Sequence, residues 1–279
     1  MGTEIVGEKR DFAIATSRRA NTVREIPLCK FMKLTSFQTV FSLVGSLLLI
    51  ASPAGEGVTP PKGFAALFNG KDLKGWWGIG TEDPAKWMAL SPEKLAEKKA
   101  KSLEDISKHW SVEGDELVND GKGLYLSTEK NFGDFELLLE YRTVPRADSG
   151  IYLRGIPQVQ IWDSTDKGKF KHGADKGSGG LWNNPKGQGK DPLVLADKPL
   201  GEWNSFRIIM AGDLVTVYLN GKLVVDHAKL QNYFNKKGAL PEKGPIQLQT
   251  HGGEIRWRNV FVREIGAEES KAIQGKAKK

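Results

Sequence analysis

Three strands and the two turns that join them can be read from residues 205–226, SFRIIMAGDLVTVYLNGKLVVD. Asn220-Gly221 lies between two apolar runs and indicates a tight hairpin, because both central residues of a type I′ turn need a positive φ. Gly212-Asp213 marks a second turn between apolar runs in the same way. The stretch therefore predicts consecutive strands joined by hairpin turns.

Short apolar runs separated by glycine-rich turns continue over most of the chain. Further strands are predicted at 64–68, 116–120, 123–127, 135–144, 150–154, 158–163, 245–251 and 254–265. Many short strands of this kind are typical of an all-β sandwich of two sheets. One helix is predicted, at 91–107, where Ser91 can cap the first turn and Pro92 can begin it. Its thin apolar stripe predicts an exposed insertion.

The composition excludes several classes of protein. The chain has 279 residues, of which 27% are charged and 39% hydrophobic, as in a globular protein. A single cysteine, Cys29, excludes both a disulfide framework and a cysteine-rich zinc module. No apolar run reaches the roughly 18 residues of a spanning helix, which excludes a polytopic membrane protein.

The first 54 residues predict export. Lys33 precedes the apolar stretch 41–51, which is followed by Ser52-Pro53-Ala54. A basic start, a short apolar centre and small residues before the cut are the features of a signal peptide, here cleaved near Ala54. Met32 is a natural initiator, so residues 1–31 are either an upstream extension or a long basic leader; a membrane anchor is the alternative. We expect a periplasmic or extracellular protein with no membrane span after cleavage.

The chain after Ala54 divides into a linker at 55–63, one domain at 64–265 and a charged tail at 266–279. The whole chain has 41 Lys and Arg against 34 Asp and Glu, and seven of these bases and four of these acids precede residue 55. The remaining net charge of about +4 is too mild to indicate nucleic acid as a partner.

Three segments of the predicted sheet combine an aliphatic face with a polar or aromatic face. Side chains alternate between the faces of a strand, so the residues of one parity share a side. The polar sides hold Tyr152 and Arg154 in GIYLR, Gln158, Gln160 and Trp162 in QVQIWD, and Gln247, Gln249 and His251 in PIQLQTH. Amides offer donors and acceptors, and aromatic rings offer flat apolar surfaces. If the segments are neighbours they form a carbohydrate cleft; otherwise they are solvated sheet faces.

Two residues are candidates for acid–base chemistry in this cleft. Asp163 and His251 each end a polar segment, and a histidine beside a carboxylate is suited to proton transfer. The loop 164–190 is either a mobile solvated loop or a lid that points Trp182, Asn183 and Asn184 inward. No spaced His, Asp or Glu cluster indicates a zinc site. No cofactor is predicted, although single carboxylates leave a bound calcium ion open.

Several segments together resemble the 3-keto-disaccharide hydrolase domain family. They are LFNGKDLKGWWG (67–78), DFELLLEYRTVPRADSGIYLRG (134–155), QVQIWD (158–163), GSGGLWNN (177–184), LGEWNSFRIIMAGDLVTVYLNGKLVVD (200–226) and GPIQLQTHGGEIRWRNVFVREI (244–265). The resemblance covers about residues 64–265 in the expected order. It implies a concanavalin A-like jelly-roll sandwich of two antiparallel sheets that acts on glycosides with a ketone at C3.

The resemblance also implies roles for the cleft residues. His251 and Asp163 would be the acid and base, Arg154 and Gln160 would donate to the enolate or to hydroxyls, and Trp162 and Trp182 would stack on sugar. Many members of that family have a glutamate where Gln158 stands, and a glutamine can be neither a base nor an anionic metal ligand.

Two other functions fit the same residues. A non-catalytic carbohydrate-binding module would use the cleft without an acid–base pair. A surface-attached interaction protein would use its lysines to meet an acidic polysaccharide. The oligomeric state is left open by the sequence.

Overall fold

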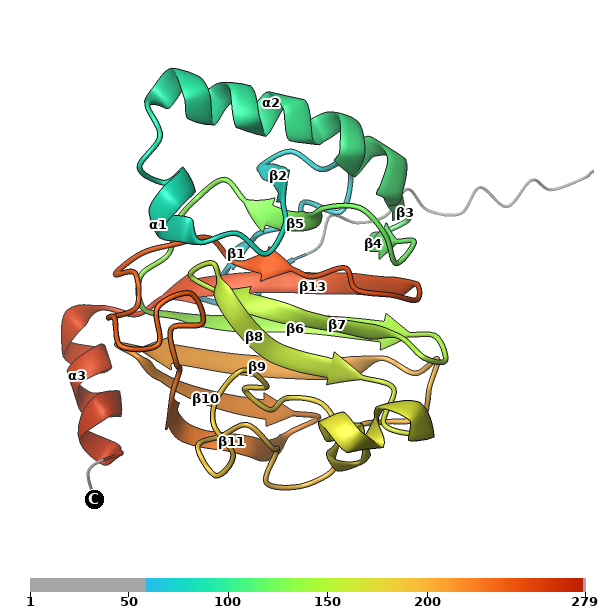
Figure 1. Ribbon diagram of the computed structural model, residues 1–279, viewed down its shortest axis with the longest axis vertical. Coiled ribbons are helices and arrows are strands. Elements are labelled where there is room, and N and C mark those ends of the chain that lie inside the picture. Colours follow the sequence, from blue (N-terminus) through green and yellow to red (C-terminus); the bar gives the residue numbers. More distant parts are fainter. Residues whose placement is uncertain (1–58, 278–279) are drawn as a thin grey trace, which may run out of the picture. The chain divides into compact units, whose positions relative to one another are not determined.

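The computed structural model describes residues 59–277, so the predicted signal peptide and its cleavage near Ala54 lie outside the described residues. Two antiparallel sheets form the domain (Figure 1). The larger sheet has eight strands in the spatial order β11 (Lys222–Lys229), β10 (Leu214–Leu219), β9 (Asn204–Ala211), β6 (Phe135–Thr143), β13 (Ile255–Glu264), β4 (Glu116–Asn119) and β3 (Trp110–Glu113), with β1 (Ala65–Ala66) paired to β13.

The smaller sheet has five strands, in the order β2 (Trp76–Ile79), β5 (Tyr125–Thr128), β12 (Gln247–Leu248), β7 (Asp148–Leu153) and β8 (Ile156–Trp162). The three polar segments of the sequence fall on β12, β7 and β8. These strands are hydrogen-bonded neighbours although about 90 residues separate β8 from β12 along the chain. The prediction that the three segments lie side by side is therefore confirmed.

Alternation along the strands builds a single apolar core between the two sheets. In the larger sheet Phe206, Ile208 and Met210 are buried while Arg207 between them is exposed. In the smaller sheet Val159 and Ile161 belong to the same buried cluster. Because one face of each strand is used for the core, the other face of the smaller sheet is free to carry polar side chains.

The helix predicted at 91–107 is α2 (Pro92–His109). Ser91 is its N-cap and accepts a hydrogen bond from the backbone of Lys94, at 3.4 Å. α2 packs on β2 (Figure 1), and a Cβ at Gly78 would lie 2.8 Å from Cγ1 of Ile106. The absence of a side chain at Gly78 therefore allows the close approach of this thin apolar stripe.

Other elements were not predicted: β2, β3, the short helix α1 (Pro84–Trp87), the C-terminal helix α3 (Ala267–Lys276) and the 3-10 helices η1 (Lys167–His172) and η2 (Ala174–Lys176). α3 occupies most of the segment expected to be a charged tail. Ser270 is buried and its hydroxyl donates to Asp134, and Arg263 donates to Glu269 at 2.8 Å. The hydroxyl of Ser270 and the carboxylate of Glu269 therefore attach α3 to the larger sheet. No helix within residues 59–277 is long and apolar enough to cross a bilayer.

Candidate active site

The register of the smaller sheet arranges its polar face in rows. Asp148 lies opposite Trp162, and Gly150 lies opposite Gln160. On the other side of β7, the backbone N–H of Gln249 donates to Gly150 at 2.9 Å, and that of Asp148 donates to Gly252. The polar residues of β7, of β8 and of the segment after β12 therefore project from one face.

This face forms the floor of a cavity of about 360 Å³, a volume within the usual range for small-molecule sites. Residues of the loop between β8 and β9 line its other side. The lining residues are Thr81, Tyr125, Asp148, Tyr152, Pro157, Gln158, Gln160, Trp162, Lys169, His172, Trp182, Asn183, Tyr233, Gln249 and His251. Eight of the ten site residues predicted from the sequence are among them.

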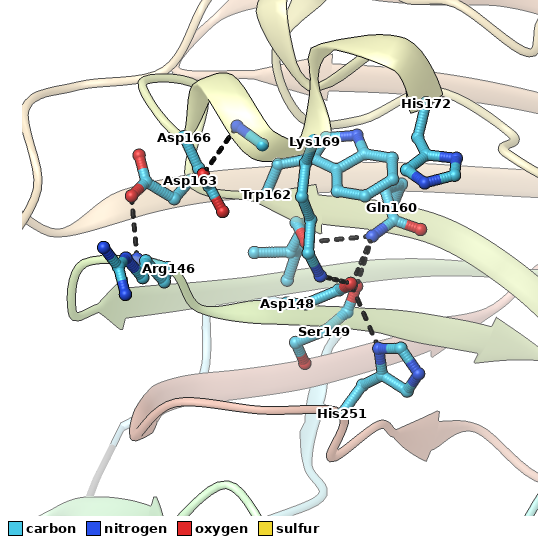
Figure 2. Close-up of polar contacts among 12 residues, drawn as sticks. Arg146, Asp148, Ser149, Gln160, Trp162, Asp163, Asp166, Lys169, His172 and His251 are labelled. Atoms are coloured by element: carbon cyan, nitrogen blue, oxygen red, sulfur yellow. Dashed lines mark hydrogen bonds and ion pairs between the residues drawn. The ribbon is translucent and has the colours of Figure 1, made fainter.

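Asp148 is the centre of a charged cluster in this cavity (Figure 2). Its Oδ2 forms ion pairs with Nζ of Lys169 and, at 3.0 Å, with Nδ1 of His251. Its Oδ1 accepts a hydrogen bond from Nε2 of Gln160 at 2.8 Å. The side chain of Asp148 is only 8% exposed, whereas that of His251 is 59% exposed. A buried anion thus orients a histidine whose Nε2 can meet a ligand.

The pKa of Asp148 lies below its ordinary value, and the pKa of His251 lies above its ordinary value. Burial alone would raise the pKa of Asp148, but the hydrogen bonds from His251 and Lys169 more than offset it, and the carboxyl lies below its ordinary value. The same hydrogen bond from Asp148 raises the pKa of His251, against burial and the charge of Lys169. The cluster therefore holds a carboxylate and a histidine that takes up a proton readily.

Glutamines occupy the middle of the cavity floor. Gln158 donates through Nε2 to Oε1 of Gln160, so the two amides are fixed relative to each other. Gln249 is 5% exposed, and its Oε1 is buried without a hydrogen-bond partner. A Cβ on Gly150 would lie 3.0 Å from this Oε1. A buried acceptor without a partner is costly.

Two tryptophans stand at the charged end of the cavity. The rings of Trp162 and Trp182 pack edge to face with their centroids 6.0 Å apart. Nζ of Lys190 lies 4.7 Å from the centroid of the Trp182 ring, and that of Lys169 lies 5.9 Å from the Trp162 ring. The loop 164–190 thus turns Trp182 and Asn183 toward the cavity, as the lid interpretation of the sequence expected. Asn184, which that interpretation also pointed inward, is instead buried outside the cavity lining, where its Nδ2 donates to the carbonyls of Gln188 and Lys229.

Asp163 lies outside the cavity and is not the partner of His251. Its carboxylate accepts a hydrogen bond from the backbone of Arg146 at 2.7 Å (Figure 2). It also accepts hydrogen bonds from the backbone and the hydroxyl of Thr165. Burial raises its pKa, but these hydrogen bonds more than offset that effect and lower it. Trp162 faces the cavity, so the next residue points to the opposite side of the strand. Asp163 therefore joins the turn at Arg146 to the start of the loop 164–190.

Arg154 is also absent from the cavity lining. It forms with Gly155 a two-residue turn between β7 and β8 in which both φ values are positive, 54° and 75°. The turn ends the alternation that places Tyr152 on the cavity face. The guanidinium pairs with Asp134 and donates to the carbonyl of Gly133 at 2.8 Å. Arg154 thus joins the hairpin to the strand end before β6 and has a structural role.

Arg154→Ala is expected to lower the free energy of unfolding by about 3 kcal/mol, because it leaves Asp134 without its buried cationic partner. Chemical denaturation measures this change. Lys108→Ala is the matched control, since it breaks the exposed pair with Glu104 and should leave the free energy of unfolding nearly unchanged. A stable Arg154→Ala variant with impaired sugar binding would return Arg154 to the site.

Sequence reasoning missed Asp148, Lys169 and Tyr125. Asp148 has the parity of Gly150 and Tyr152, so a strand predicted two residues earlier would have included it on the cavity face. Tyr125 lies in a predicted strand that was not assigned to the polar surface. Lys169 belongs to η1 in the loop 164–190, where no periodic pattern shows which way a side chain points.

Within residues 59–277 no three or more His, Cys, Asp or Glu side chains are grouped so that they could hold a metal ion. The cavity contains one buried carboxylate, whose oxygens already meet His251, Lys169 and Gln160. The donor set thus favours proton transfer and hydrogen bonding to a polar organic ligand.

Comparisons with known proteins identify the family. Residues 63–263 match the family described as the 3-keto-alpha-glucoside-1,2-lyase-like domain. A relative from Bacteroides thetaiotaomicron, named 3-keto-disaccharide hydrolase, is 23% identical over 249 residues, covering 73% of this chain and 79% of that protein. A crystal structure from Parabacteroides distasonis, provisionally described as a glycosyl hydrolase, has a TM-score of 0.52 and 18% identity, covers 76% of this chain and 100% of its own, and shows the shared fold. Because the family match spans most of the sequence, this chain belongs to the 3-keto-alpha-glucoside-1,2-lyase-like domain family.

Proposed function

We propose that this protein is an enzyme that cleaves 3-keto-glycosides by removing the C2 proton, eliminating the C1 oxygen and adding water. The observation that carries the proposal is the buried Asp148 carboxylate, which is ion-paired to both His251 and Lys169 in a cavity lined by amides and aromatic rings. The family description and the name of the Bacteroides relative support the same substrate class.

The reaction needs three groups around the sugar. A ketone at C3 acidifies the proton on C2, so a base of modest strength can remove it. Negative charge then develops on the C3 oxygen and needs a cationic or hydrogen-bonding partner. The oxygen on C1 needs a proton as its bond to carbon breaks. The cavity offers a histidine for the proton transfers and an ammonium group for the oxyanion.

His251 and Lys169 divide these tasks in the proposed mechanism. Asp148 holds Nδ1 of His251, and Nε2 takes the C2 proton while Lys169 stabilises the enolate oxygen at C3. The enolate collapses, the C1–O bond breaks, and His251 returns its proton to the leaving oxygen. Water then adds to C1 and gives a proton to His251, which delivers it to C2. The net reaction of the elimination and the hydration is hydrolysis of the glycosidic bond.

The remaining lining residues would hold the sugar. Gln160 is fixed by Asp148 and Gln158, and Nε2 of Gln249 donates to the hydroxyl of Tyr125 at 3.5 Å. The tryptophan rings at the charged end offer apolar faces to the C–H surface of a pyranose. This combination of fixed amides and aromatic rings favours a neutral polyhydroxylated ligand.

The test is incubation of the protein with methyl 3-keto-glucoside in D₂O. Release of methanol is expected, together with deuterium at C2 of the product, which NMR detects. Deuterium marks the C2 proton as one that leaves carbon, as elimination and rehydration require. Methanol release with protium retained at C2 would contradict the mechanism. Binding without release would contradict the enzyme and favour the carbohydrate-binding module.

A further inference from the structure

An apolar segment between η2 and β9 is exposed at the surface. Leu193, Val194 and Leu195 are 66%, 42% and 51% exposed, and none of them lines the cavity on the smaller sheet. Within residues 59–277 they are the only run of consecutive large apolar residues that are all exposed. Single exposed apolar side chains are common on soluble proteins, whereas apolar side chains gathered at one place mark a contact surface. Residues 193–195 are called the apolar segment below.

The apolar segment is held in place beside strand β11. The backbone N–H of Leu193 donates to the carbonyl of Val224 at 2.8 Å. Just after the segment, Nδ2 of Asn220 donates to the carbonyl of Ala196 at 2.8 Å. Hydrogen bonds therefore fix both ends of the segment, and its side chains are presented next to the turn between β10 and β11.

Two lysines accompany the apolar segment. Lys222 is the first residue of β11 and lies between Asn220 and Val224, the two residues that hold the ends of the segment. Lys198 follows the segment by three residues, and its Nζ donates to the carbonyl of Trp203 at 2.8 Å. Both lysines are exposed, and neither forms an ion pair with any acid in the described part of the chain.

The nearest acids have partners of their own. Asp191 is paired with Lys176 at 2.9 Å. Asp197 accepts a hydrogen bond from the backbone of Ser178 at 2.9 Å, and burial raises its pKa. Asp226, further along β11, pairs with the next residue, His227. Beside the apolar segment, the charges without an acidic partner are therefore those of Lys198 and Lys222.

An added β-strand fits the apolar segment poorly. Pro192 has no backbone N–H, and the N–H of Leu193 is already bonded to β11, so few donors are left for a further strand. A second copy paired antiparallel about Val194 would also place Lys190 opposite Lys198, and like charges opposite each other destabilise a strand pair. Apolar side chains beside unpaired lysines instead match a surface that has an apolar interior and an anionic exterior.

We infer that the apolar segment binds the surface of an anionic phospholipid bilayer. Its leucine and valine side chains enter the boundary between headgroups and acyl chains, while Lys198 and Lys222 contact the lipid phosphates. Buried apolar area and electrostatic attraction contribute together to binding of this kind. The inference is independent of the proposed catalytic function, because the apolar segment lies outside the cavity lining.

The experiment measures sedimentation of the protein with vesicles of equal parts phosphatidylglycerol and phosphatidylcholine. It uses the chain that begins at Gly55, the form expected after cleavage, so that the apolar stretch 41–51 cannot itself bind lipid. Both sheets and the described core lie within residues 59–277, so this form keeps the fold. Leu193→Asp should lower the partition coefficient at least about tenfold, as expected when a leucine no longer enters an apolar phase.

Leu103→Asp is the matched control for the apolar contact. Leu103 is 49% exposed on α2, and its replacement should leave the partition coefficient unchanged. Thermal unfolding of both variants checks that neither substitution disturbs the fold. Leu193→Asp should also keep the kcat/KM of the wild-type protein for methyl 3-keto-glucoside, so lipid binding and catalysis are measured separately.

Lys222→Gln tests the electrostatic part of the contact. It should lower the partition coefficient on the anionic vesicles about fivefold, the contribution of one lysine near such a surface, and change little on vesicles of phosphatidylcholine alone. Lys101→Gln, which removes an exposed lysine of α2, should have no effect.

Three results would overturn the inference. The first is a wild-type protein that does not sediment with the anionic vesicles. The second is an equal loss of binding in Leu193→Asp and Leu103→Asp. The third is a dimer in analytical ultracentrifugation that Leu193→Asp dissociates, because the apolar segment would then be a contact between two copies of this chain.

Discussion

His251→Ala is expected to lower kcat/KM for methyl 3-keto-glucoside at least about a hundredfold, the usual cost of removing a general acid–base group. The loss should be large because one imidazole carries every proton transfer in the proposed mechanism. Stability should hardly change, since 59% of the His251 side chain is exposed and little packing is lost. Progress curves for methanol release and thermal unfolding of the same sample measure both quantities.

His109→Ala is the matched control for this variant. His109 also holds a carboxylate, with Nδ1 at 3.0 Å from Oδ2 of Asp120, but it does not line the cavity. Its removal should leave kcat/KM unchanged. If His251→Ala kept full activity, another residue would be the base. If it lowered the melting temperature far more than His109→Ala, the histidine would be structural.

Strand periodicity placed much of the cavity surface correctly. The alternation in QVQIWD assigns Gln158, Gln160 and Trp162 to one face, and all three line the cavity. The same rule applied to PIQLQTH places Gln249 and His251 there. Parity depends only on local geometry, so it can be read from any strand whose limits are known.

The two incorrect placements both arise at strand ends. Trp162 and Asp163 have opposite parity, so the rule itself excludes Asp163 from the cavity face. At Arg154 the strand has already given way to a turn with positive φ, and alternation no longer applies. Strand limits are set by hydrogen bonds to neighbouring strands, which the local sequence does not specify.

The charged cluster itself could not be predicted from local patterns. Asp148 precedes the apolar run that marks β7, and Lys169 lies in a 3-10 helix within a glycine- and lysine-rich loop. The contact between Lys169 and Asp148 depends on how that loop crosses the sheet. Likewise, the charged residues of 266–279 resemble a solvated tail until Ser270 and Glu269 meet partners beside and on the larger sheet.

Asp148→Asn is expected to lower the plateau of kcat/KM about a hundredfold and to move its acidic limb to lower pH. The proposed base is neutral His251, and the acidic limb reports its pKa in the free enzyme. Asp148 raises that pKa above the ordinary 6.5, whereas the nearby charge of Lys169 lowers it. Losing the carboxylate removes the first effect and leaves the second, so His251 stays neutral at lower pH. A pH series of initial rates measures both the plateau and the limb.

Asp120→Asn separates this effect from a general response to losing a carboxylate beside a histidine. The Asp120–His109 pair has the same 3.0 Å separation as the Asp148–His251 pair but lies outside the cavity. Its variant should keep both the plateau and the limb. An acidic limb that stays in place in Asp148→Asn would show that a group other than His251 titrates there. A limb that moves to higher pH would contradict the assignment of Asp148 as the anion that orients the base.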